Sequence, residues 1–542
     1  MSGKDINPSE VCNINVGVMG HVDSGKTSLV KALSVILSTA SLDKNPQSRQ
    51  RGITLDLGFS AFLSNIPSSI PDTSYKYIQY TLVDCPGHAS LIRTILGGAQ
   101  IIDMLLIVID CMKGIQAQTA ECMVIGEITT DKVILVLNKI DLIPEAERET
   151  RIPTIISNIK KVISKTRFKN APIIPVSAQV GGGSIEDVNT SSIGMSTLTT
   201  AIQSMITLPN KDDPSPLYFV YDHLFTIAGK GCVMTGTVLA GTLHVGDDVE
   251  FPGLHLTRKV KSIQMFHKNI DCVKKGDRAG VCVQAFDIKG ERGEVCSIGS
   301  LAPIQNVIIR LKKIRFYKGE IQSGATFHIS IGHHTIPAVI TLFTDHTAQE
   351  KLNENGFGAG IFSEEVNSFD LDKSYEYTPA MTKPASPADR PVVWALLQLE
   401  HAVYAPLGSL LIGSQLNTAA TDTACRIAFY AKAVQTLPAE KEALKVLRVY
   451  KPKVREASVD RVVSEYEVIG TNLTEKGGSV AAFVGLHVVT KDGVQGTIDA
   501  PFGKTGKFKV SFRQEHHLSK NDALAIHFRR YIFDKEKKIH QE

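Results

Sequence analysis

The chain has little of what characterises secreted or membrane-spanning proteins. Its nine cysteines are scattered over 542 residues and form no C-x-x-C pair, which argues against a disulfide or zinc framework and favours reduced thiols. No run of about 18 apolar residues occurs, so no membrane-spanning helix is predicted. Residues 1–11 lack the apolar core of a secretory signal. We therefore expect a cytoplasmic protein, with a nuclear pool allowed, and no membrane partner.

Strong charge of one sign is also missing from the chain as a whole. There are 59 Lys and Arg against 55 Asp and Glu, a net charge of +4. Residues 440–542 alone hold 19 Lys and Arg against 14 Asp and Glu, so the rest of the chain is close to neutral. The positive charge belongs to the last part of the chain, and nucleic acid is its expected partner.

A phosphate-binding pattern is present near the start. Residues 20–27 fit G-x-x-x-x-G-K-[ST], with a buried-strand pattern before them and a helical pattern after them. In this context the loop's N–H groups and the helix dipole bind phosphate, Lys26 reaches the β- and γ-phosphates, and the Thr27 hydroxyl binds Mg²⁺. The residues expected around the phosphates are Gly20, His21, Val22, Asp23, Ser24, Gly25, Lys26, Thr27 and Ser28.

Three later segments, each at the end of an apolar strand, identify the nucleotide as GTP. Asp84 is placed to hold Mg²⁺ through water, and Gly87 to offer its N–H to the γ-phosphate. Asn138, Lys139 and Asp141 form an Asn-Lys-x-Asp sequence in which the carboxylate accepts from the guanine N1–H and amino groups. Ser177 and Ala178 are expected to place a backbone N–H near the guanine O6.

The order of expected elements predicts several domains. Residues 1–212 alternate strands and helices, which is typical of an α/β GTP-binding domain with a doubly wound, mostly parallel sheet. Residues 213–304 show short strands and glycine turns, which predict a β-barrel. Residues 305–438 read as a second barrel, with a polar interruption at about 350–387 expected to be disordered. Residues 439–542 form a basic β-rich domain. Residues 181–192 read as a flexible surface insertion.

Longer stretches resemble one family, the eukaryotic selenocysteine-specific elongation factors, which carry tRNA as translational GTPases. The likeness extends over essentially the whole chain and is weakest in the long loops and the tail. It is carried by residues 46–59 (PQSRQRGITLDLGF), 20–27 (GHVDSGKT), 84–88 (DCPGH), 231–237 (GCVMTGT), 484–486 (VGL) and 502–509 (FGKTGKFK).

The resemblance implies roles in hydrolysis for residues whose spacing alone says little. Thr54 matches the switch threonine that closes on Mg²⁺ and the γ-phosphate, and it lies only 27 positions after Thr27, so switch I is expected to be compact. His88 matches the residue that orients the attacking water when ribosomal RNA positions it. From spacing alone His88 reads as a surface histidine, and the resemblance reverses that interpretation. Asp23 matches a loop aspartate that helps to hold a monovalent cation.

The resemblance also implies an aminoacyl pocket in the first barrel. Asp222, His223 and Arg278 match residues that line the selenocysteine pocket. A selenol is ionised at neutral pH where serine is not, so a pocket that presents cations separates the two. We expect Arg278 and His223 to face the selenolate and Asp222 to orient or charge His223. Without the resemblance, these residues read as a surface salt bridge.

In the last domain the basic residues are candidates for contact with RNA. On a strand, Lys507 and Lys509 share one face, opposite Phe508, Val510 and Phe512. The phenylalanines of this segment, including Phe502, read as core, and the lysines read equally as a solvated face. The candidate RNA-binding residues are Lys504, Lys507, Lys509, Arg529 and Arg530.

Together these features predict a GTP-dependent elongation factor that delivers selenocysteinyl-tRNA to the ribosome at recoded UGA codons. GTP, GDP and Mg²⁺ are the expected cofactors. The resemblance implies ribosomal RNA and the SECIS element-binding protein or its mRNA complex as partners of a monomer. Two alternatives stay open: another tRNA-carrying GTPase, such as an initiation-factor gamma subunit or a general elongation factor, and a GTP-switched interaction protein without an aminoacyl pocket.

Overall fold

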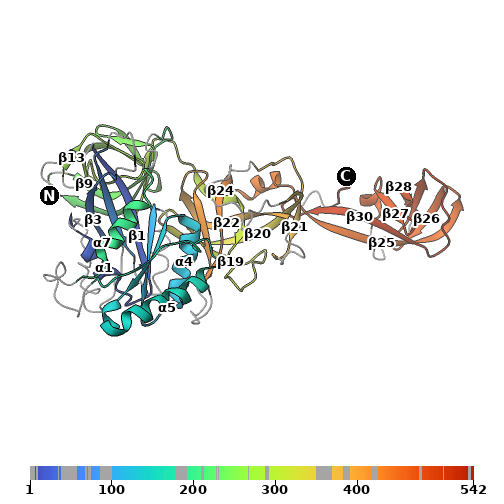
Figure 1. The fold of residues 1–542 in the computed structure, drawn as a ribbon. Coiled ribbons are helices and arrows are strands. Elements are labelled where there is room, and N and C mark those ends of the chain that lie inside the picture. Colours follow the sequence, from blue (N-terminus) through green and yellow to red (C-terminus); the bar gives the residue numbers. More distant parts are fainter. Residues whose placement is uncertain are drawn as a thin grey trace. The chain divides into compact units, whose positions relative to one another are not determined.

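The computed structural model divides the chain into two compact units. The first takes in Met1–Ile340 and Leu397–Thr436, and the second takes in Thr341–Leu352, Ser368–Leu396 and Leu437–Glu542 (Figure 1). The residues that the structure describes are 7, 10–34, 36–37, 58–67, 70, 75–85, 101–164, 166–178, 192–208, 213–227, 229, 231–265, 268–286, 292–349, 369–381, 391–416, 425–474, 479–503, 506–534 and 539–541.

The first domain of unit 1 is built on a seven-stranded sheet of order β2-β3-β4-β1-β5-β6-β7. Five strands are parallel, as the alternating sequence predicts: β1 (Val11–Gly20), β4 (Tyr77–Asp84), β5 (Met104–Asp110), β6 (Val133–Asn138) and β7 (Ile173–Pro175). Strand β3 (Gly58–Asn65) runs antiparallel to β4 and to β2 (Ile36–Leu37). The carboxyl ends of the parallel strands therefore meet at one edge of the sheet, where ligands of such folds bind.

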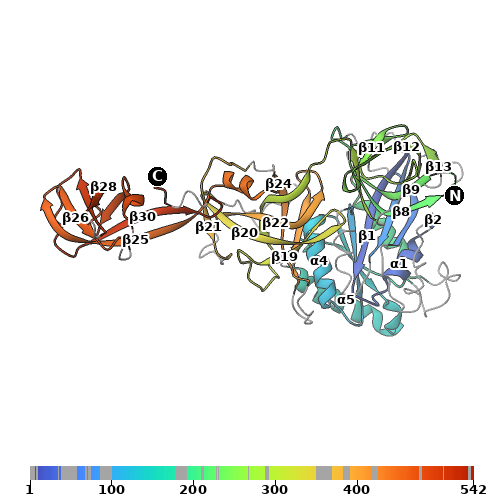
Figure 2. The same cartoon turned by 180° about the vertical axis from the view of Figure 1, so that it is seen from behind.

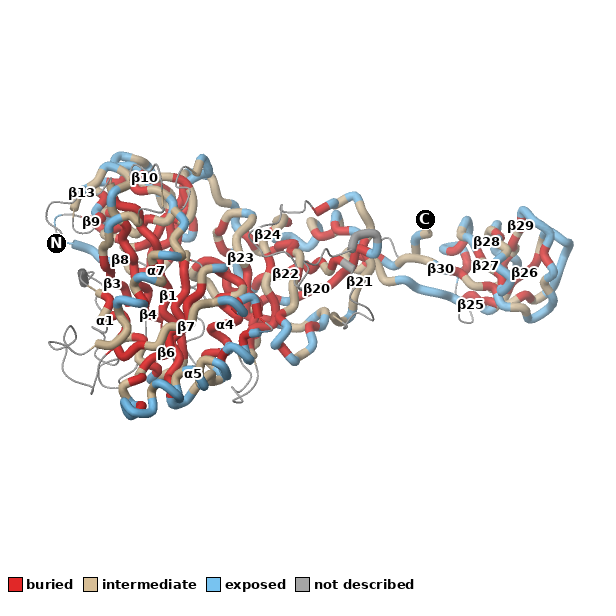
Figure 3. The backbone as a smooth tube through the Cα atoms, viewed as in Figure 1, coloured by how far each residue is buried: buried red, intermediate tan, exposed pale blue. Residues whose placement is uncertain are grey.

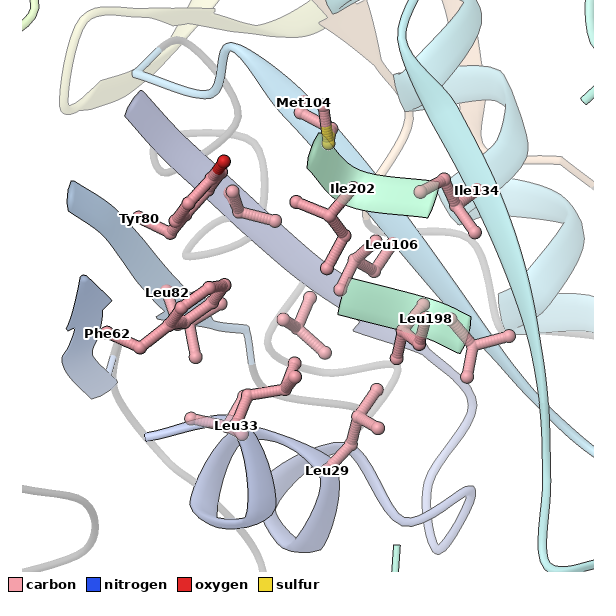
Figure 4. Packing of buried hydrophobic residues seen from close by; sticks show 14 of the residues in the cluster. Leu29, Leu33, Phe62, Tyr80, Leu82, Met104, Leu106, Ile134, Leu198 and Ile202 are labelled. Atoms are coloured by element: carbon pink, nitrogen blue, oxygen red, sulfur yellow. The ribbon is translucent and has the colours of Figure 1, made fainter. Parts of the chain in front are cut away.

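Helices cover both faces of this sheet. On one face, α1 (Lys26–Leu33) and α7 (Met195–Ser204) pack their apolar residues against β1, β4 and β5. Figure 4 shows Leu29 and Leu33 of α1 with Leu198 and Ile202 of α7 in this core. On the other face lies α4 (Ala117–Thr129), where Gly126 lies close to Leu105. Helix α5 (Glu145–Ile163) buries only Ile159 and Ile163, so most of its surface faces solvent. A short 3-10 turn, η3, spans Ile140–Leu142.

The second domain of unit 1 is a closed six-stranded barrel, in agreement with the predicted β-barrel fold. Its strands follow the order β11-β16-β8-β9-β15-β12, and a β11–β12 pairing closes the ring (Figure 2). Alternate residues fill the interior, and β10 and β14 form a separate ribbon. The strands are β8 (Tyr218–Ile227), β9 (Gly231–Ala240), β10 (Thr242–His244), β11 (Asp248–Phe251), β12 (Leu256–Met265), β13 (Lys268–Ile270), β14 (Cys272–Lys274), β15 (Arg278–Val283) and β16 (Gly293–Ser297), with the 3-10 turn η6 (Pro252–Leu254).

A second ring of six strands follows in the order β19-β23-β24-β17-β22-β20, and β19 pairs with β20 to close it. Closure removes the free edges that an open sheet would expose. Its strands are β17 (Pro303–Arg310), β19 (Thr326–Ile331), β20 (His334–Gln349), β22 (Pro391–Tyr404), β23 (Leu410–Ser414) and β24 (Ile427–Leu437), with the short β18 (Lys312–Lys313) paired to β24.

Unit 2 contains a third ring, β25-β26-β29-β28-β27-β30, which a β25–β30 pairing closes. Figure 3 shows buried and exposed residues interspersed along these strands, and the buried ones form one hydrophobic cluster. Its elements are β25 (Val449–Ser464), β26 (Glu467–Thr471), β27 (His487–Thr490), β28 (Gln495–Phe502), β29 (Lys507–Phe512) and β30 (Ala523–Tyr531), with the 3-10 turns η7 (Lys441–Val446) and η8 (Ala481–Phe483).

Two expectations need correction in unit 2. The disorder expected at 350–387 is wrong for residues 369–381. This segment holds β21 (Tyr375–Thr378) and buries Phe369 and Tyr375. An aromatic cluster orders this segment, because the rings of Phe369 and Tyr375 stack at 4.8 Å and Phe369 meets Trp394 at 5.0 Å. Phe508 and Phe512 are buried as predicted, but Phe502 is 41% exposed at the end of β28. The predicted insertion at 181–192 lies almost entirely outside the described residues.

Candidate functional site

The loop between β1 and α1 has a backbone that requires glycine. Gly25 adopts φ 88° at the start of α1, and a Cβ added there would lie 2.3 Å from the Asn138 amide nitrogen. A Cβ on Gly20 would lie 2.4 Å from the Val108 carbonyl oxygen. Asp23 also has a positive φ of 59°. The loop is therefore held tightly against the ends of β5 and β6, with its N–H groups at the start of a helix.

Lys26 is buried in this loop, and its Nζ donates to the His21 carbonyl oxygen at 2.8 Å. Burial lowers the pKa of Lys26, and the nearby Asp84 carboxylate partly opposes that shift. Ser24 Oγ is also buried, with no hydrogen-bond partner among the described residues. Buried polar groups that lack a partner are costly, so an ammonium and a hydroxyl in this loop fit the phosphates that the sequence predicts.

The Thr27 hydroxyl donates to Asp84 Oδ2 at 2.7 Å. The two side chains come from the start of α1 and the end of β4. Hydroxyl and carboxylate oxygens are the ligands that Mg²⁺ prefers, and this ion commonly takes only one or two protein ligands beside substrate phosphates. Within the described part of the chain, no cluster of three His, Cys, Asp or Glu could hold a metal by itself.

The predicted guanine-binding residues come together beside the loop. Asn138, at the end of β6, donates from its amide to the Ser24 carbonyl oxygen at 2.9 Å and accepts from the Ala178 N–H at 3.2 Å. The Ser177 hydroxyl donates to Asp141 Oδ1 at 2.6 Å. Asn138 thus joins the phosphate loop to the Ser177–Ala178 segment, and the Asp141 carboxylate is oriented by a fixed hydroxyl.

Asp110, which no sequence motif singled out, ends β5 and supports this site. Its Oδ2 lies 2.9 Å from Lys139 Nζ, and its Oδ1 accepts from the Met112 N–H at 2.8 Å. Burial alone would raise the pKa of Asp110, but the bonds from Lys139 and from the backbone outweigh burial and lower it. Lys139 has a left-handed backbone, φ 66°, and its Cε lies 3.9 Å from the Cβ position of Gly25. An acidic residue directly after an apolar strand was the available signal.

Four predicted residues lie outside the described part of the chain: Thr54, Gly87, His88 and Lys504.

The structure brings together two of the three predicted pocket residues. Arg278 Nη2 donates to both Asp222 oxygens, at 2.6 and 3.0 Å, and the two side chains are 12% and 4% exposed. The guanidinium carbon lies 3.3 Å from the centroid of the Phe59 ring, which belongs to β3. The expected pairing of Asp222 with His223 is not found among the described hydrogen bonds, in which Arg278 and Thr235 are the partners of this carboxylate. Buried ion pairs of this kind are not ordinary surface salt bridges.

The turn before Arg278 is attached to the central strand of the nucleotide domain. The Gly276 carbonyl oxygen accepts from the side-chain amides of Asn13 at 2.8 Å and Asn15 at 3.1 Å. Both asparagines are buried in β1, the strand that ends at the phosphate loop. Arg278 is therefore positioned by its own barrel, by β1 and by β3.

On the β29 strand of unit 2, the predicted alternation is found, but the basic face is partly neutralised. Lys507 Nζ lies 2.7 Å from Asp460 Oδ2 and Lys509 Nζ lies 2.8 Å from Glu467 Oε2. Arg529 stacks on the Tyr450 ring at 4.4 Å. Arg530 lies beside it on β30, opposite Lys451 of β25. The cations are present, and two of them are already paired with carboxylates.

Family models match four consecutive parts of the chain. They are the elongation factor Tu GTP binding domain at residues 12–208, elongation factor Tu domain 2 at 231–297, the third domain of eukaryotic selenocysteine-specific elongation factors at 308–431, and the eEFSec C-terminal RIFT domain at 445–524. The chain is a GTP-binding translational GTPase. Within the described residues, no helix is both long and apolar enough to cross a membrane.

Two relatives and one solved structure agree with these matches. The selenocysteine-specific elongation factor of Mus musculus is 43% identical over 92% of this chain and 88% of its own, and that of Methanocaldococcus jannaschii is 35% identical over 64% of this chain and 68% of its own. The elongation factor SelB of Methanococcus maripaludis, solved with the GTP analogue GppNHp, shares the fold with a TM-score of 0.65 at 24% identity, over 96% of this chain and 99% of that one. The chain belongs to the family of selenocysteine-specific elongation factors.

Proposed function

We propose that this GTPase binds selenocysteinyl-tRNA in its GTP form and delivers it to the ribosome at recoded UGA codons. The observation that carries the proposal is the Arg278–Asp222 pair, because it places a guanidinium in a sheltered site of the first barrel. The same guanidinium stacks on Phe59, five residues after Thr54 in the chain. A pocket that touches the strand following the switch threonine can sense which nucleotide is bound.

In the nucleotide site, each residue has a role that its contacts support. Lys26 would leave the His21 carbonyl and bind the β- and γ-phosphates, and Asp141 would select guanine. Thr27, Asp84 and, by family resemblance, Thr54 would hold Mg²⁺, which neutralises charge that develops on the phosphates. Asp23, in its left-handed loop position, would help to hold a monovalent cation.

Hydrolysis depends on positioning more than on covalent chemistry by the protein. His88 would orient the attacking water once ribosomal RNA holds its side chain, and the Gly87 N–H would bind the γ-phosphate. Both roles rest on the family resemblance. Because that geometry would be completed by the ribosome, GTP would remain intact until the codon is read.

In the pocket, Arg278 would face the selenolate and His223 would lie beside it, while Asp222 holds the guanidinium. Because the selenolate is an anion and the serine hydroxyl is neutral, this arrangement would favour the selenium-containing ester. The basic strands of unit 2, with Lys504, Lys507, Lys509, Arg529 and Arg530, would contact tRNA, the ribosome or the SECIS element-binding protein with its mRNA. The protein would act as a monomer in the cytoplasm.

The decisive experiment is to identify the RNA that the GTP-bound protein retains. We expect selenocysteinyl-tRNA and protection of its ester from hydrolysis. Retention of methionyl initiator tRNA, of many aminoacyl-tRNAs or of no RNA would contradict the proposal and favour one of the two alternatives.

A substitution in the pocket tests the same proposal from the protein side. Arg278→Lys keeps the charge but loses the fork and the ring stack, so protection of selenocysteinyl-tRNA should fall by about tenfold or more while GTP affinity is unchanged. The matched control is Arg258→Lys in the same barrel, where the guanidinium lies 5.7 Å from the Phe286 ring and contacts no pocket residue in the described structure. Equal losses in both variants would contradict the assignment.

A further inference from the structure

A histidine in the β19–β20 turn of unit 1 lies in the electrostatic surroundings of the pocket. Strands β19 and β20 form a hairpin in which Ile331 pairs with His334, so Gly332 and His333 are its two turn residues. Gly332 has a positive φ of 53°. Glycine first, followed by a residue with ordinary backbone angles, fits a type II′ turn, whose twist matches that of the strands. The turn therefore presents His333 on a rigid hairpin.

This turn is held against the first barrel at two points. His334 Nε2 lies 2.8 Å from Glu294 Oε2, and Glu294 pairs with Val220 of β8. A Cβ on Gly332 would lie 3.0 Å from the Tyr218 hydroxyl, also of β8. Strand β8 carries Asp222. The His334–Glu294 interaction and this close approach thus place the turn beside the strand that supplies the pocket carboxylate.

The charges of the pocket act on the His333 imidazole, and one of its ring nitrogens has no hydrogen-bond partner among the described residues. Asp222 and Arg278 both act on the imidazole, as do Arg292 and its neighbour His334. Its Nε2 is buried and makes no hydrogen bond to any described residue. A buried ring nitrogen left without a partner is costly. The cost is understandable if a ligand supplies the missing partner.

The pocket also needs a further donor for an anion. The charges of Arg278 and Asp222 offset each other, because Nη2 contacts both carboxylate oxygens. A selenolate that entered beside this pair would meet a guanidinium whose charge Asp222 partly offsets, and buried anions also need hydrogen-bond donors. Burial lowers the pKa of His333 to about 4 in the structure, so the ring is neutral near pH 7 and offers one N–H donor.

We propose that His333 is a specificity-determining residue of the aminoacyl pocket, which donates from Nε2 to the selenium atom of the bound selenocysteinyl ester. The inference rests on the proposed function. It assigns the β19–β20 turn a direct part in amino-acid selection, with Arg278 supplying charge on one side of the ligand and His333 a neutral donor on another. Selection would then require this turn to be docked on the first barrel, as it is in unit 1.

The test compares His333→Ala and His333→Gln with the unchanged full-length protein in its GTP form. The measurement is the ratio of the dissociation constants for selenocysteinyl-tRNA and seryl-tRNA, taken from protection of each ester against hydrolysis. His333→Ala should weaken selenocysteinyl-tRNA by about 10- to 100-fold, the range expected for loss of a hydrogen bond to a charged group, and should change seryl-tRNA little. His333→Gln, which restores an N–H donor, should recover most of the ratio.

Two controls distinguish a His333 that donates a hydrogen bond to the ligand from a His333 that only supports the fold. His334→Gln alters the residue that anchors the same turn while leaving His333, and it should keep the ratio of the unchanged protein. GTP-analogue affinity and the melting temperature report folding in every variant. An unchanged ratio in His333→Ala, or an equal loss for both tRNAs, would overturn the inference. Failure of the unchanged protein to protect selenocysteinyl-tRNA would instead overturn the proposed function itself.

Discussion

The nucleotide site and the aminoacyl pocket of unit 1 are built in different ways. The nucleotide site draws its residues from the ends of neighbouring strands of one sheet, and Asn138 links two of its segments by hydrogen bonds. The pocket draws Asp222 and Arg278 from one barrel and Phe59 from the nucleotide domain. A site within one sheet keeps its geometry whenever that domain folds. A pocket made from several domains exists only while they are packed together, so it can be opened by moving them.

The largest expected effect comes from breaking the nucleotide site alone. In Asp141→Asn, the amide NH₂ replaces an acceptor facing the guanine N1–H and amino groups, so GTP affinity should fall by on the order of 100-fold or more. Xanthosine triphosphate, with a carbonyl in place of the amino group, should bind the variant better than GTP does. Nucleotide titration measures both affinities.

With xanthosine triphosphate bound, the same variant should again protect selenocysteinyl-tRNA, because no pocket residue has changed. If protection stays lost although the nucleotide binds, then the aminoacyl pocket also depends on Asp141, and the two sites cannot be changed independently.

A smaller effect is expected where the aminoacyl pocket contacts the nucleotide domain, at the stack of Arg278 on Phe59. Phe59→Leu removes the aromatic face beneath Arg278 while keeping an apolar side chain in β3. Cation–π contacts contribute about 0.5–2 kcal/mol, so selenocysteinyl-tRNA protection should fall by roughly three- to thirtyfold with GTP affinity nearly unchanged. The control is Phe62→Leu in the same strand, whose ring stacks on Tyr80 at 4.5 Å and not on an arginine. Similar loss of protection in both variants would point to damage in β3 rather than to the stack.

The pH dependence of stability should distinguish the two histidines of the β19–β20 turn. Burial lowers the pKa of His333 to about 4, so the unfolded state binds the proton first and stability falls as pH drops from 6.5 toward 4. Burial opposes protonation of His334 too, but Glu294 outweighs it and raises its pKa. Its contribution is fully present below pH 6.5 and is lost as pH rises through the raised value, with a magnitude of about 1 kcal/mol or less.

Denaturant unfolding, measured over the pH range in which the two histidines change charge, tests the predicted direction of the stability change for each of them. His333→Gln should reduce the loss on the acid side, where the charges of Asp222, Arg278, Arg292 and His334 act on the ring. His334→Gln should reduce the loss on the alkaline side. Stability changes in the opposite directions would contradict the lowered pKa of His333 and the raised pKa of His334.

The smallest effect is expected on the basic face of unit 2. Asp460→Asn releases Lys507 from its carboxylate partner, so tRNA binding should tighten by a few-fold at low salt, whereas Lys507→Ala should weaken it and reduce the salt slope by about one. Lys491→Ala, in the exposed turn after β27, serves as the matched control. Binding that does not respond to salt in any of these proteins would argue against phosphate contacts on this face.

The sequence predicted which of the described nucleotide-site residues lie together, because each motif carries its own local geometry. Asn138, Asp141 and Ser177 follow strands whose order in the sheet brings them together. The partner of Asp222 was wrongly predicted, because His223 is its neighbour in the chain while Arg278 is its neighbour across the barrel. Phe59 and Asp460 could not be predicted as partners of Arg278 and Lys507, since each comes from a separate element that meets the cation only after folding.

The hydrogen bonds from Asn13 and Asn15 to the Gly276 carbonyl oxygen have a consequence for building hybrid factors. A first barrel transplanted from another GTPase would have to bring a carbonyl oxygen to the same point, or two amides buried in β1 would each lose one of two acceptors at a cost of about 1 kcal/mol each. The acceptors that remain are Asn15 Oδ1 for Asn13 and Asp103 Oδ2 for Asn15. Exchange of amino-acid specificity between such proteins is thus easier by altering side chains inside the barrel than by replacing the barrel. Strand β1 therefore favours a barrel whose turn places a carbonyl oxygen within hydrogen-bond distance of these two asparagines.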